Sequence, residues 1–325
     1  MKNITVLGGG VLGSQIAFQS SYMGFNVTIY LRSEGSIERC KPKLAKLKET
    51  YIKSINLMAK DKSYDSWCNG ISSYDDFDKD KCLKKVEDGF NNIKLELDLA
   101  KSVNDADLVI ESMSEEMEAK KDMFIRLSKV LPSKTIVVTN SSTMLPSRLA
   151  KYTNRPDKFL ALHFANSIWK NNIAEVMKQK DTKEEYFNIV LNFAKEINMI
   201  PLPVRKEKSG YLLNSMLIPF LFSALDLVVN EISDPTSIDK AWTIGTGSPE
   251  GPFQILDIVG LKTAYDIVEM YVKIPSFLAP YNFKGMHKLL KKYLDEGKLG
   301  KASGEGFYKY DNDKRGNNNE KENNI

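Results

Sequence analysis

The stretch that decides the fold is Ile4-Thr5-Val6-Leu7-Gly8-Gly9-Gly10-Val11-Leu12-Gly13. Its first four residues read as a short strand, and three spaced glycines follow at once. A helix is predicted over residues 11–23, ended by Gly24, and a second strand over residues 27–31. A strand, a glycine turn, a helix and a second strand within about thirty residues are typical of a dinucleotide-binding unit.

The spaced glycines each have a physical task in such a turn. Gly8 permits the tight turn, Gly10 the close approach of a pyrophosphate, and Gly13 close packing of helix on strand. The predicted helix begins at Val11, with Leu12 in its first turn, and its N-terminus offers free N–H groups and the positive end of the helix dipole. We therefore expect this turn to bind a nicotinamide dinucleotide, the alternative being a glycine-rich turn that binds nothing.

The end of the second strand bears on the choice between NAD and NADP. NAD-binding chains usually carry an acid there, which accepts hydrogen bonds from the ribose 2′-hydroxyl. Here Leu31 occupies that place and Arg32 follows it. Because an arginine can pair with a 2′-phosphate, NADP(H) is slightly favoured over NAD(H). The alternative is that Arg32 is a solvated loop residue and NAD binds without the acid.

The remainder of the chain first continues the alternation of strands and helices and then becomes helical. Strands are predicted at 106–111, 135–139, 159–164 and 173–176, and helices at 37–60, 79–88 and 116–130. This order predicts an α/β fold with a Rossmann-like, doubly wound sheet, followed by an all-helical C-terminal domain. The predicted domains are 1–204, with a helical insertion at 36–92, and 205–310. Residues 311–325 are predicted to be a disordered tail.

Composition excludes several classes of protein. The chain has 325 residues, 42% of them hydrophobic and 27% charged, which is ordinary for a soluble globular protein. A net charge of +4 argues little for nucleic acid. No apolar run has the length of a membrane span or a signal peptide, so a cytoplasmic protein is expected. The three cysteines lack CxxC spacing, so neither a disulfide framework nor a metal site is expected.

Histidine is scarce, which narrows the search for an acid/base group to His163 and His287. His163 lies at the end of a predicted strand, as does the segment Asn140-Ser141-Ser142. A hairpin-like return of the chain would bring Glu175 back to His163 as a partner that orients the ring. The plainer alternatives are a buried core histidine, a surface glutamate and residues that cap a helix.

Seven segments together resemble the 3-hydroxyacyl-CoA dehydrogenase family over residues 1–310. They are Gly8–Gly13, Thr139-Asn140-Ser141-Ser142, Leu162-His163-Phe164-Ala165-Asn166, Ala174-Glu175-Val176, Gly210-Tyr211-Leu212-Leu213-Asn214, Gly251-Pro252-Phe253 with Asp257-Ile258-Val259-Gly260-Leu261, and Gly304-Glu305-Gly306-Phe307-Tyr308. The resemblance implies hydride transfer between a nicotinamide cofactor and the 3-hydroxy/3-oxo carbon of an acyl-CoA.

The resemblance also implies roles for individual residues. His163 would be the catalytic base, Glu175 its orienting carboxylate and Ser142 a contact to the substrate oxygen. Asn214 would support the site from the second domain. Four further residues would border the cofactor, namely Asn140, Asn166, Glu111 and Lys120. The helical domain would dimerise, and the 36–92 insertion would help to hold CoA.

This sequence departs from the family pattern after His163. The family's His-Phe-Phe-Asn-Pro becomes His163-Phe164-Ala165-Asn166-Ser167 here, and Trp169 follows. This segment and Trp242 resemble a subgroup that includes diketoreductases. The alternative substrate is therefore a 3-oxo or diketo acid or ester without CoA, and Trp169 is either a wall of the substrate pocket or part of the core. A further alternative is a protein that binds the cofactor without chemistry.

Overall fold

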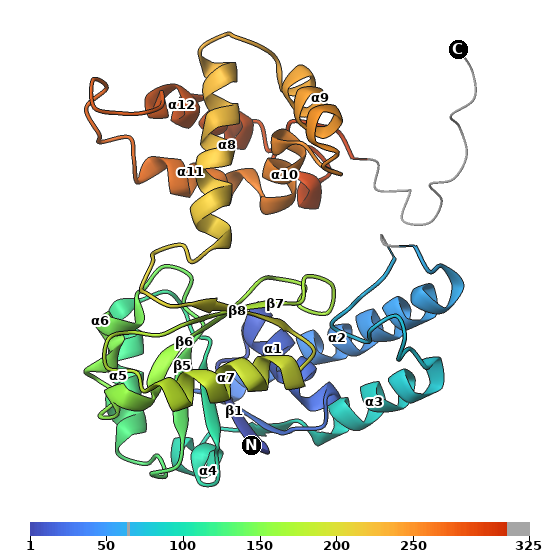
Figure 1. The fold of residues 1–325 in the computed structure, drawn as a ribbon, viewed down its shortest axis with the longest axis vertical. Coiled ribbons are helices and arrows are strands. Elements are labelled where there is room, and N and C mark those ends of the chain that lie inside the picture. Colours follow the sequence, from blue (N-terminus) through green and yellow to red (C-terminus); the bar gives the residue numbers. More distant parts are fainter. Residues whose placement is uncertain (64–65, 311–325) are drawn as a thin grey trace. The chain divides into compact units, whose positions relative to one another are not determined.

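The computed structural model describes residues 1–63 and 66–310; the predicted tail at 311–325 lies outside the described residues. The chain divides into two compact units between Leu212 and Leu213. Tyr211 belongs to the first unit because its buried ring packs with Ala161, Met177 and Val204. Figure 1 shows the first unit as a sheet covered by helices and the second as helices only.

Within the described residues, eight strands form one sheet in the order β3-β2-β1-β4-β5-β6-β7-β8. They are β1 (Asn3–Leu7), β2 (Asn26–Tyr30), β3 (Lys94–Glu96), β4 (Leu108–Glu111), β5 (Ile136–Thr139), β6 (Phe159–Phe164), β7 (Ile173–Met177) and β8 (Ile200–Val204). All neighbours are parallel except β6 and β7. The strand order reverses direction beside β1, as a doubly wound sheet requires, and the predicted fold class is confirmed.

Helices cover both faces of the sheet. The first unit has α1 (Val11–Tyr22), α2 (Glu34–Lys60), α3 (Lys79–Asn92), α4 (Leu99–Val103), α5 (Met117–Ser128), α6 (Pro146–Ala150), η1 (Pro156–Lys158) and α7 (Glu184–Glu196). Successive strand residues point to opposite faces. Along β4, Leu108 and Ile110 therefore pack in the core formed with α1, α2, α3 and α7, whereas Val109 packs in the core formed with α5 and α6.

Helix α2 accounts for the lysine-rich segment of the insertion. It starts at Glu34, slightly before the predicted start at residue 37. Its buried residues recur at helical spacing and are Cys40, Leu44, Leu47, Tyr51, Ile55 and Met58. The lysines between them, such as Lys41, Lys46 and Lys53, are exposed. One apolar stripe and one charged face are what an amphipathic helix on a core produces.

The second unit is built from α8 (Leu213–Val229), α9 (Pro235–Thr246), α10 (Pro252–Val259), α11 (Leu261–Glu269), α12 (Phe283–Asp295) and η2 (Lys301–Ser303). Its core includes Phe253, Leu261, Met286 and Leu290, all essentially inaccessible to solvent. None of the helices in the described ranges is both long and apolar enough to cross a membrane.

Candidate active site

The glycine turn between β1 and α1 has the geometry of a phosphate cradle. Gly8 has a φ of +107°, and a Cβ on Gly13 would lie 2.2 Å from the carbonyl oxygen of Gly8. Larger residues would therefore distort the turn at both positions. At Gly10, by contrast, a Cβ would meet no atom within 4 Å. Space outside Gly10, beside a helix N-terminus with no side-chain cap, fits the close approach of a dinucleotide pyrophosphate.

A cleft of about 640 Å³ opens from this turn. The turn itself lines it from Gly8 to Gly13, together with Leu31 and Arg32 after β2, the first turns of α2, part of α5, and both Asn140 and Ser142 after β5. The cleft therefore lies at the carboxyl ends of β1, β2, β4 and β5, where ligands bind in open parallel sheets. Its position and the glycine turn together fit a nicotinamide dinucleotide.

Four cationic side chains line the cleft: Arg32, Arg39, Lys43 and Arg126. The Lys43 ammonium donates to the carbonyl oxygen of Gly9 at 3.0 Å, so it lies beside the glycine turn. Arg39 donates to the Ser36 hydroxyl at 3.1 Å. This part of the cleft carries positive charge from two helices and a strand end, which suits an anionic ligand.

Leu31, which occupies the place of the usual acid, is 4% exposed and belongs to the apolar core. A Cβ on Gly9 would lie 2.9 Å from the Leu31 side chain, so Leu31 packs beneath the turn. No carboxylate is therefore presented by residue 31, while Arg32 beside it is exposed.

His163 and Glu175 form a buried pair on the two antiparallel strands of the sheet. They are directly opposed in the register of β6 and β7, with His163 8% and Glu175 1% exposed. The His163 Nδ1 to Glu175 Oε2 distance is 3.0 Å. The second carboxylate oxygen, Oε1, accepts a hydrogen bond from the Leu212 backbone N–H at 2.8 Å. The hairpin-like return predicted from the sequence is thus observed, and it orients the imidazole ring.

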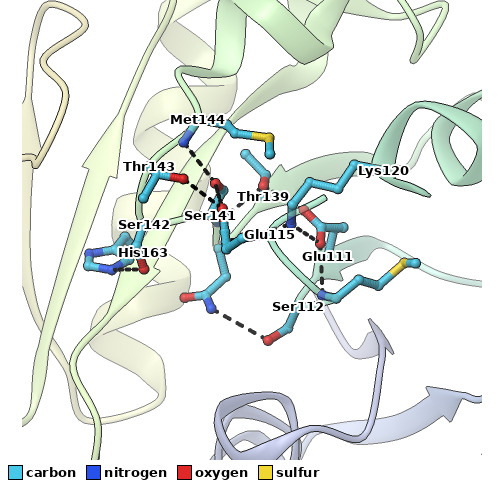
Figure 2. Close-up of polar contacts among 12 residues, drawn as sticks. Glu111, Ser112, Glu115, Lys120, Thr139, Ser141, Ser142, Thr143, Met144 and His163 are labelled. Carbon is cyan, nitrogen blue, oxygen red and sulfur yellow. Dashed lines mark hydrogen bonds and ion pairs between the residues drawn. The ribbon is translucent and has the colours of Figure 1, made fainter. Parts of the chain in front are cut away.

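Ser142 and Asn140 come to His163 from the end of β5. The Ser142 Oγ lies 3.2 Å from Nε2 of His163, the ring nitrogen opposite Glu175, as Figure 2 shows. The Asn140 side-chain oxygen accepts from the Phe164 N–H at 3.1 Å. Its amide nitrogen faces the Ser112 hydroxyl at 3.4 Å. Asn140 thereby ties the cleft wall to the histidine strand.

Glu111 and Lys120 form a buried ion pair at 2.5 Å, with both residues 0% exposed (Figure 2). Glu111 also accepts from the Met113 N–H at 2.8 Å and from the Thr139 hydroxyl at 2.6 Å. Neither Glu111 nor Lys120 is among the cleft-lining residues. Glu115 does line the cleft, and it accepts from the hydroxyl of Ser141 at 2.6 Å.

The other predicted site residues are not brought to the His163 pair within the first unit. Asn166 is exposed, follows β6 and does not line the cleft. Asn214 lies in the first turn of α8 in the second unit. Trp169 is half-buried and its ring centroid lies 5.7 Å from that of Tyr51 of α2, so it packs against the core.

Three residues of this region were missed by sequence reasoning: Lys43, Glu115 and Tyr211. Lys43 could have been found, because Arg39 and Lys43 are four residues apart and share one face of the predicted helix. Glu115 lies in a short loop after a strand, and the sequence does not distinguish it from the other acids close by. Tyr211 stacks on the His163 ring, with centroids 4.5 Å apart and an angle of 17°. No local pattern marks that contact.

A dinucleotide cradle beside a buried His–Glu pair with a serine at the far ring nitrogen defines a nicotinamide-dependent oxidoreductase. The family model of the NAD-binding domain of 3-hydroxyacyl-CoA dehydrogenase matches residues 3–208, and that of its C-terminal domain matches residues 210–310. The chain belongs to the 3-hydroxyacyl-CoA dehydrogenase family, and the predicted resemblance is confirmed.

Individual relatives agree with this assignment. The human mitochondrial hydroxyacyl-coenzyme A dehydrogenase is 31% identical over 310 residues, 95% of this chain and 91% of the relative. A 3-hydroxybutyryl-CoA dehydrogenase of Clostridioides difficile is 29% identical over 94% of this chain and 99% of its own. The solved structure of a diketoreductase, described with catalysis of dicarbonyl compounds, is 43% identical with a TM-score of 0.82, and covers 95% of this chain and 99% of that chain.

Proposed function

We propose that this protein transfers a hydride between a nicotinamide cofactor and the 3-hydroxy/3-oxo carbon of an acyl-CoA, with His163 as its acid/base. The observation that carries the proposal is the line Ser142–His163–Glu175, with 3.2 Å and 3.0 Å separating the polar atoms, at the edge of the dinucleotide cleft. Family membership supports the same reaction.

The cofactor, held by the turn from Gly8 to Gly13, would supply the hydride acceptor or donor. Glu175 accepts a hydrogen bond from Nδ1–H of His163, so Nε2 is the unprotonated nitrogen that can accept a proton from the substrate hydroxyl during oxidation. During reduction the same Nε2 returns that proton to the substrate oxygen. Ser142 is placed to donate a hydrogen bond to that oxygen. As the proton arrives, the Glu175 carboxylate stabilises the imidazolium.

The substitution His163→Ala tests this mechanism. Loss of acid/base help should lower kcat for acetoacetyl-CoA reduction by about two to four powers of ten, while cofactor binding measured by fluorescence titration persists. The second histidine of the chain gives the control, since His287→Ala should leave kcat near the wild-type value. A near-normal kcat for His163→Ala would refute the mechanism. Tight cofactor binding without turnover of any 3-oxo compound would instead favour a catalytically silent protein.

The glycine cradle has its own matched pair of variants. Gly10→Ala adds a methyl group to open space, so the protein should fold normally but bind the cofactor more weakly because the pyrophosphate approach is obstructed. In α9 of the second unit, Gly245→Ala likewise meets no atom within 4 Å and should leave cofactor affinity unchanged. Equal affinities for both variants would place the cofactor elsewhere.

For the cofactor we propose a preference for NADP(H). The absence of a carboxylate at residue 31 and the three cations Arg32, Arg39 and Lys43 in the cleft support it. Initial rates with NADPH and NADH measure the preference directly. Replacing Arg32 or Arg39 by Ala should lower kcat/KM for NADPH about 10- to 100-fold, the value of one charge-assisted hydrogen bond, and change that for NADH little. A wild-type preference for NADH would make Arg32 a bystander.

A second candidate substrate is a 3-oxo or diketo ester without CoA. The 43% identity to the diketoreductase favours it, as do Ser167 and Trp169 in the segment after His163. Comparing kcat/KM for acetoacetyl-CoA with that for a free 3-oxo ester separates the two, because CoA contacts can only help the substrate that carries CoA. Equal values would count against a CoA-specific site.

The remaining roles are proposals as well. Asn140 lines the cleft and is proposed to contact the cofactor, whereas Asn166, Glu111 and Lys120, which do not line it, are proposed to border the cofactor on the family resemblance alone. Asn214 is proposed to support the substrate site, so Asn214→Ala should lower kcat without changing cofactor affinity. We also propose a cytoplasmic homodimer formed by the second unit, whose exposed apolar side chains include Met216, Ile244 and Phe277. A monomeric mass by light scattering would exclude the dimer, and cell fractionation tests the compartment.

A further inference from the structure

The dipeptide Tyr211-Leu212, which ends the first unit, contacts His163, Glu175 and the residue before Ser142. The Tyr211 ring stacks on the His163 ring. Its hydroxyl donates to the Ser141 carbonyl oxygen at 2.7 Å, next to Ser142. The Leu212 N–H donates to Glu175 at 2.8 Å. None of these contacts belongs to the mechanism proposed above.

We infer that Tyr211 is a positioning residue, which fixes the plane of the His163 imidazole and the location of Ser142. This inference rests on the proposed function of His163. The ring of His163 is bonded at two nitrogens, Nδ1 and Nε2, on opposite sides. Two hydrogen bonds in the plane of the ring restrain rotation about the Cβ–Cγ bond only weakly, because hydrogen-bond angles bend easily. A second ring stacked on its face, 4.5 Å away, limits that rotation.

The hydroxyl of Tyr211 acts on the other partner of His163. It is buried, with the residue 2% exposed, and its bond to Ser141 holds the segment after β5 at the position that brings Ser142 to Nε2. Burial, together with the nearby carboxylate of Glu175, raises the pKa of Tyr211 well above its ordinary value. The hydroxyl therefore stays a neutral donor across the whole range in which a histidine titrates.

The backbone at Tyr211 is also held in a costly conformation. Its φ is +52°, in the left-handed region that a bulky residue seldom adopts. The turn closes through a hydrogen bond from the Tyr211 N–H to the Lys208 carbonyl at 3.1 Å. This conformation lets the Tyr211 ring stack on His163 while the Leu212 N–H donates to Glu175. Backbone strain of this kind is usually found at functional sites.

The test compares Tyr211→Phe, which keeps the stacked ring, with Tyr211→Leu, which removes it. Tyr211→Leu should lower kcat about 10- to 100-fold with KM for the cofactor unchanged, since a misplaced catalytic group costs about that much. Tyr211→Phe should recover most of this loss and retain only the smaller effect of the lost Ser141 contact. If Phe loses as much as Leu, the ring is not the positioning element and the inference is wrong.

The histidine NMR spectrum supplies a readout that does not depend on turnover. The chain has two histidines, and each lies against a tyrosine: His163 stacks on Tyr211, and His287 lies at an angle of 32° to Tyr265 with ring centroids 4.4 Å apart. Tyr211→Leu should shift the ring-proton resonances of His163 alone, through loss of the ring current, and Tyr265→Leu those of His287 alone. Tyr211→Phe should shift neither.

These readouts distinguish the possible failures. If the wild-type protein turns over no 3-oxo substrate, the proposed function fails, while the NMR shifts still report on the stack. If Tyr211→Leu keeps wild-type kcat or leaves the His163 resonances in place, Tyr211 does not position the ring and the inference is overturned. If Tyr211→Leu does not fold, Tyr211→Phe decides alone: unchanged His163 resonances with nearly normal kcat support the inference, and a large loss of kcat overturns it.

Discussion

Glu175 in the first unit and Asp257 in the second are equally buried carboxylates, each 1% exposed. Their partners differ. Glu175 binds an imidazole nitrogen of His163, whereas Asp257, among the described residues, accepts from the N–H groups of Phe307 and Tyr308 and from the hydroxyl of Tyr310. Burying a carboxylate costs free energy wherever it lies, but the group that it binds determines what the carboxylate does. A carboxylate that holds a proton-transferring ring serves chemistry, and one that holds backbone serves the fold.

The largest expected effect is the loss of turnover when Glu175 is replaced, and it tests whether Glu175 differs from Asp257 in its use. In Glu175→Gln the amide oxygen would still accept the hydrogen bond from the Leu212 N–H, and the amide NH₂ would face Nδ1 of His163. That arrangement forces the proton onto Nε2, where a base must be unprotonated, so kcat should fall about 10²- to 10⁴-fold with little change in thermal stability. Steady-state kinetics and a melting curve measure both. Glu184→Gln, at an exposed pair with Lys178, is the control. A variant that melts early but turns over normally would put Glu175 in the class of Asp257.

Lys120→Met asks to which class the buried Glu111 belongs. The substitution removes the only cation within 4 Å of a carboxylate that is 0% exposed, among the described residues. An uncompensated buried charge should lower the free energy of unfolding by about 3–5 kcal/mol, measured by urea denaturation. Lys121→Met, at a more exposed pair with Glu118, should cost less than about 1 kcal/mol. A fully stable Lys120→Met variant with weakened cofactor binding would give this pair a functional role instead.

Asp257→Asn should cost stability and leave the chemistry intact. Each oxygen of Asp257 accepts from a backbone N–H, so an amide NH₂ must face one of these donors and leave it unsatisfied. The second unit should lose about 1–3 kcal/mol, read from denaturant titration, while kcat per folded molecule stays near normal. Asp266→Asn, an exposed site on α11, controls for the loss of charge. A large fall in kcat without loss of stability would break the comparison.

The smallest effect is expected at Asp107, which immediately precedes β4. Burial raises the pKa of its carboxyl, but hydrogen bonds from Lys134 and from the N–H groups of Lys2 and Asn3 outweigh this and lower the pKa from 3.8 to about 2. A folded-state pKa below the unfolded value stabilises the fold above about pH 4, and this stabilisation disappears as the pH falls towards 2. Asp107→Asn should therefore lower Tm slightly at pH 7, with a gap to wild type that narrows below pH 4. A gap independent of pH would contradict the assignment.

The parts of the fold predicted from the sequence are those with a local cause. The strand, turn and helix from Ile4 to Tyr22 follow from apolar runs and glycine positions within a few residues. The antiparallel return that opposes Glu175 to His163 was also predicted, because two extended stretches with a short connection tend to pair. The start of α2 at Glu34 was missed, because Gly35 and Ser36 in its first turn are weak helix formers.

The site divides in the same way. Chain order and residue type sufficed to predict the glycine turn, His163, Glu175 and Ser142 as site residues. The inward packing of Leu31, the ion pair that buries Lys120 and the stack of Tyr211 on His163 came only from the folded molecule. Residue periodicity and turn chemistry act over a few positions, so they can be read along the chain. Contacts between side chains tens of residues apart depend on how the strands assemble and how the core fills, which the tertiary structure alone decides.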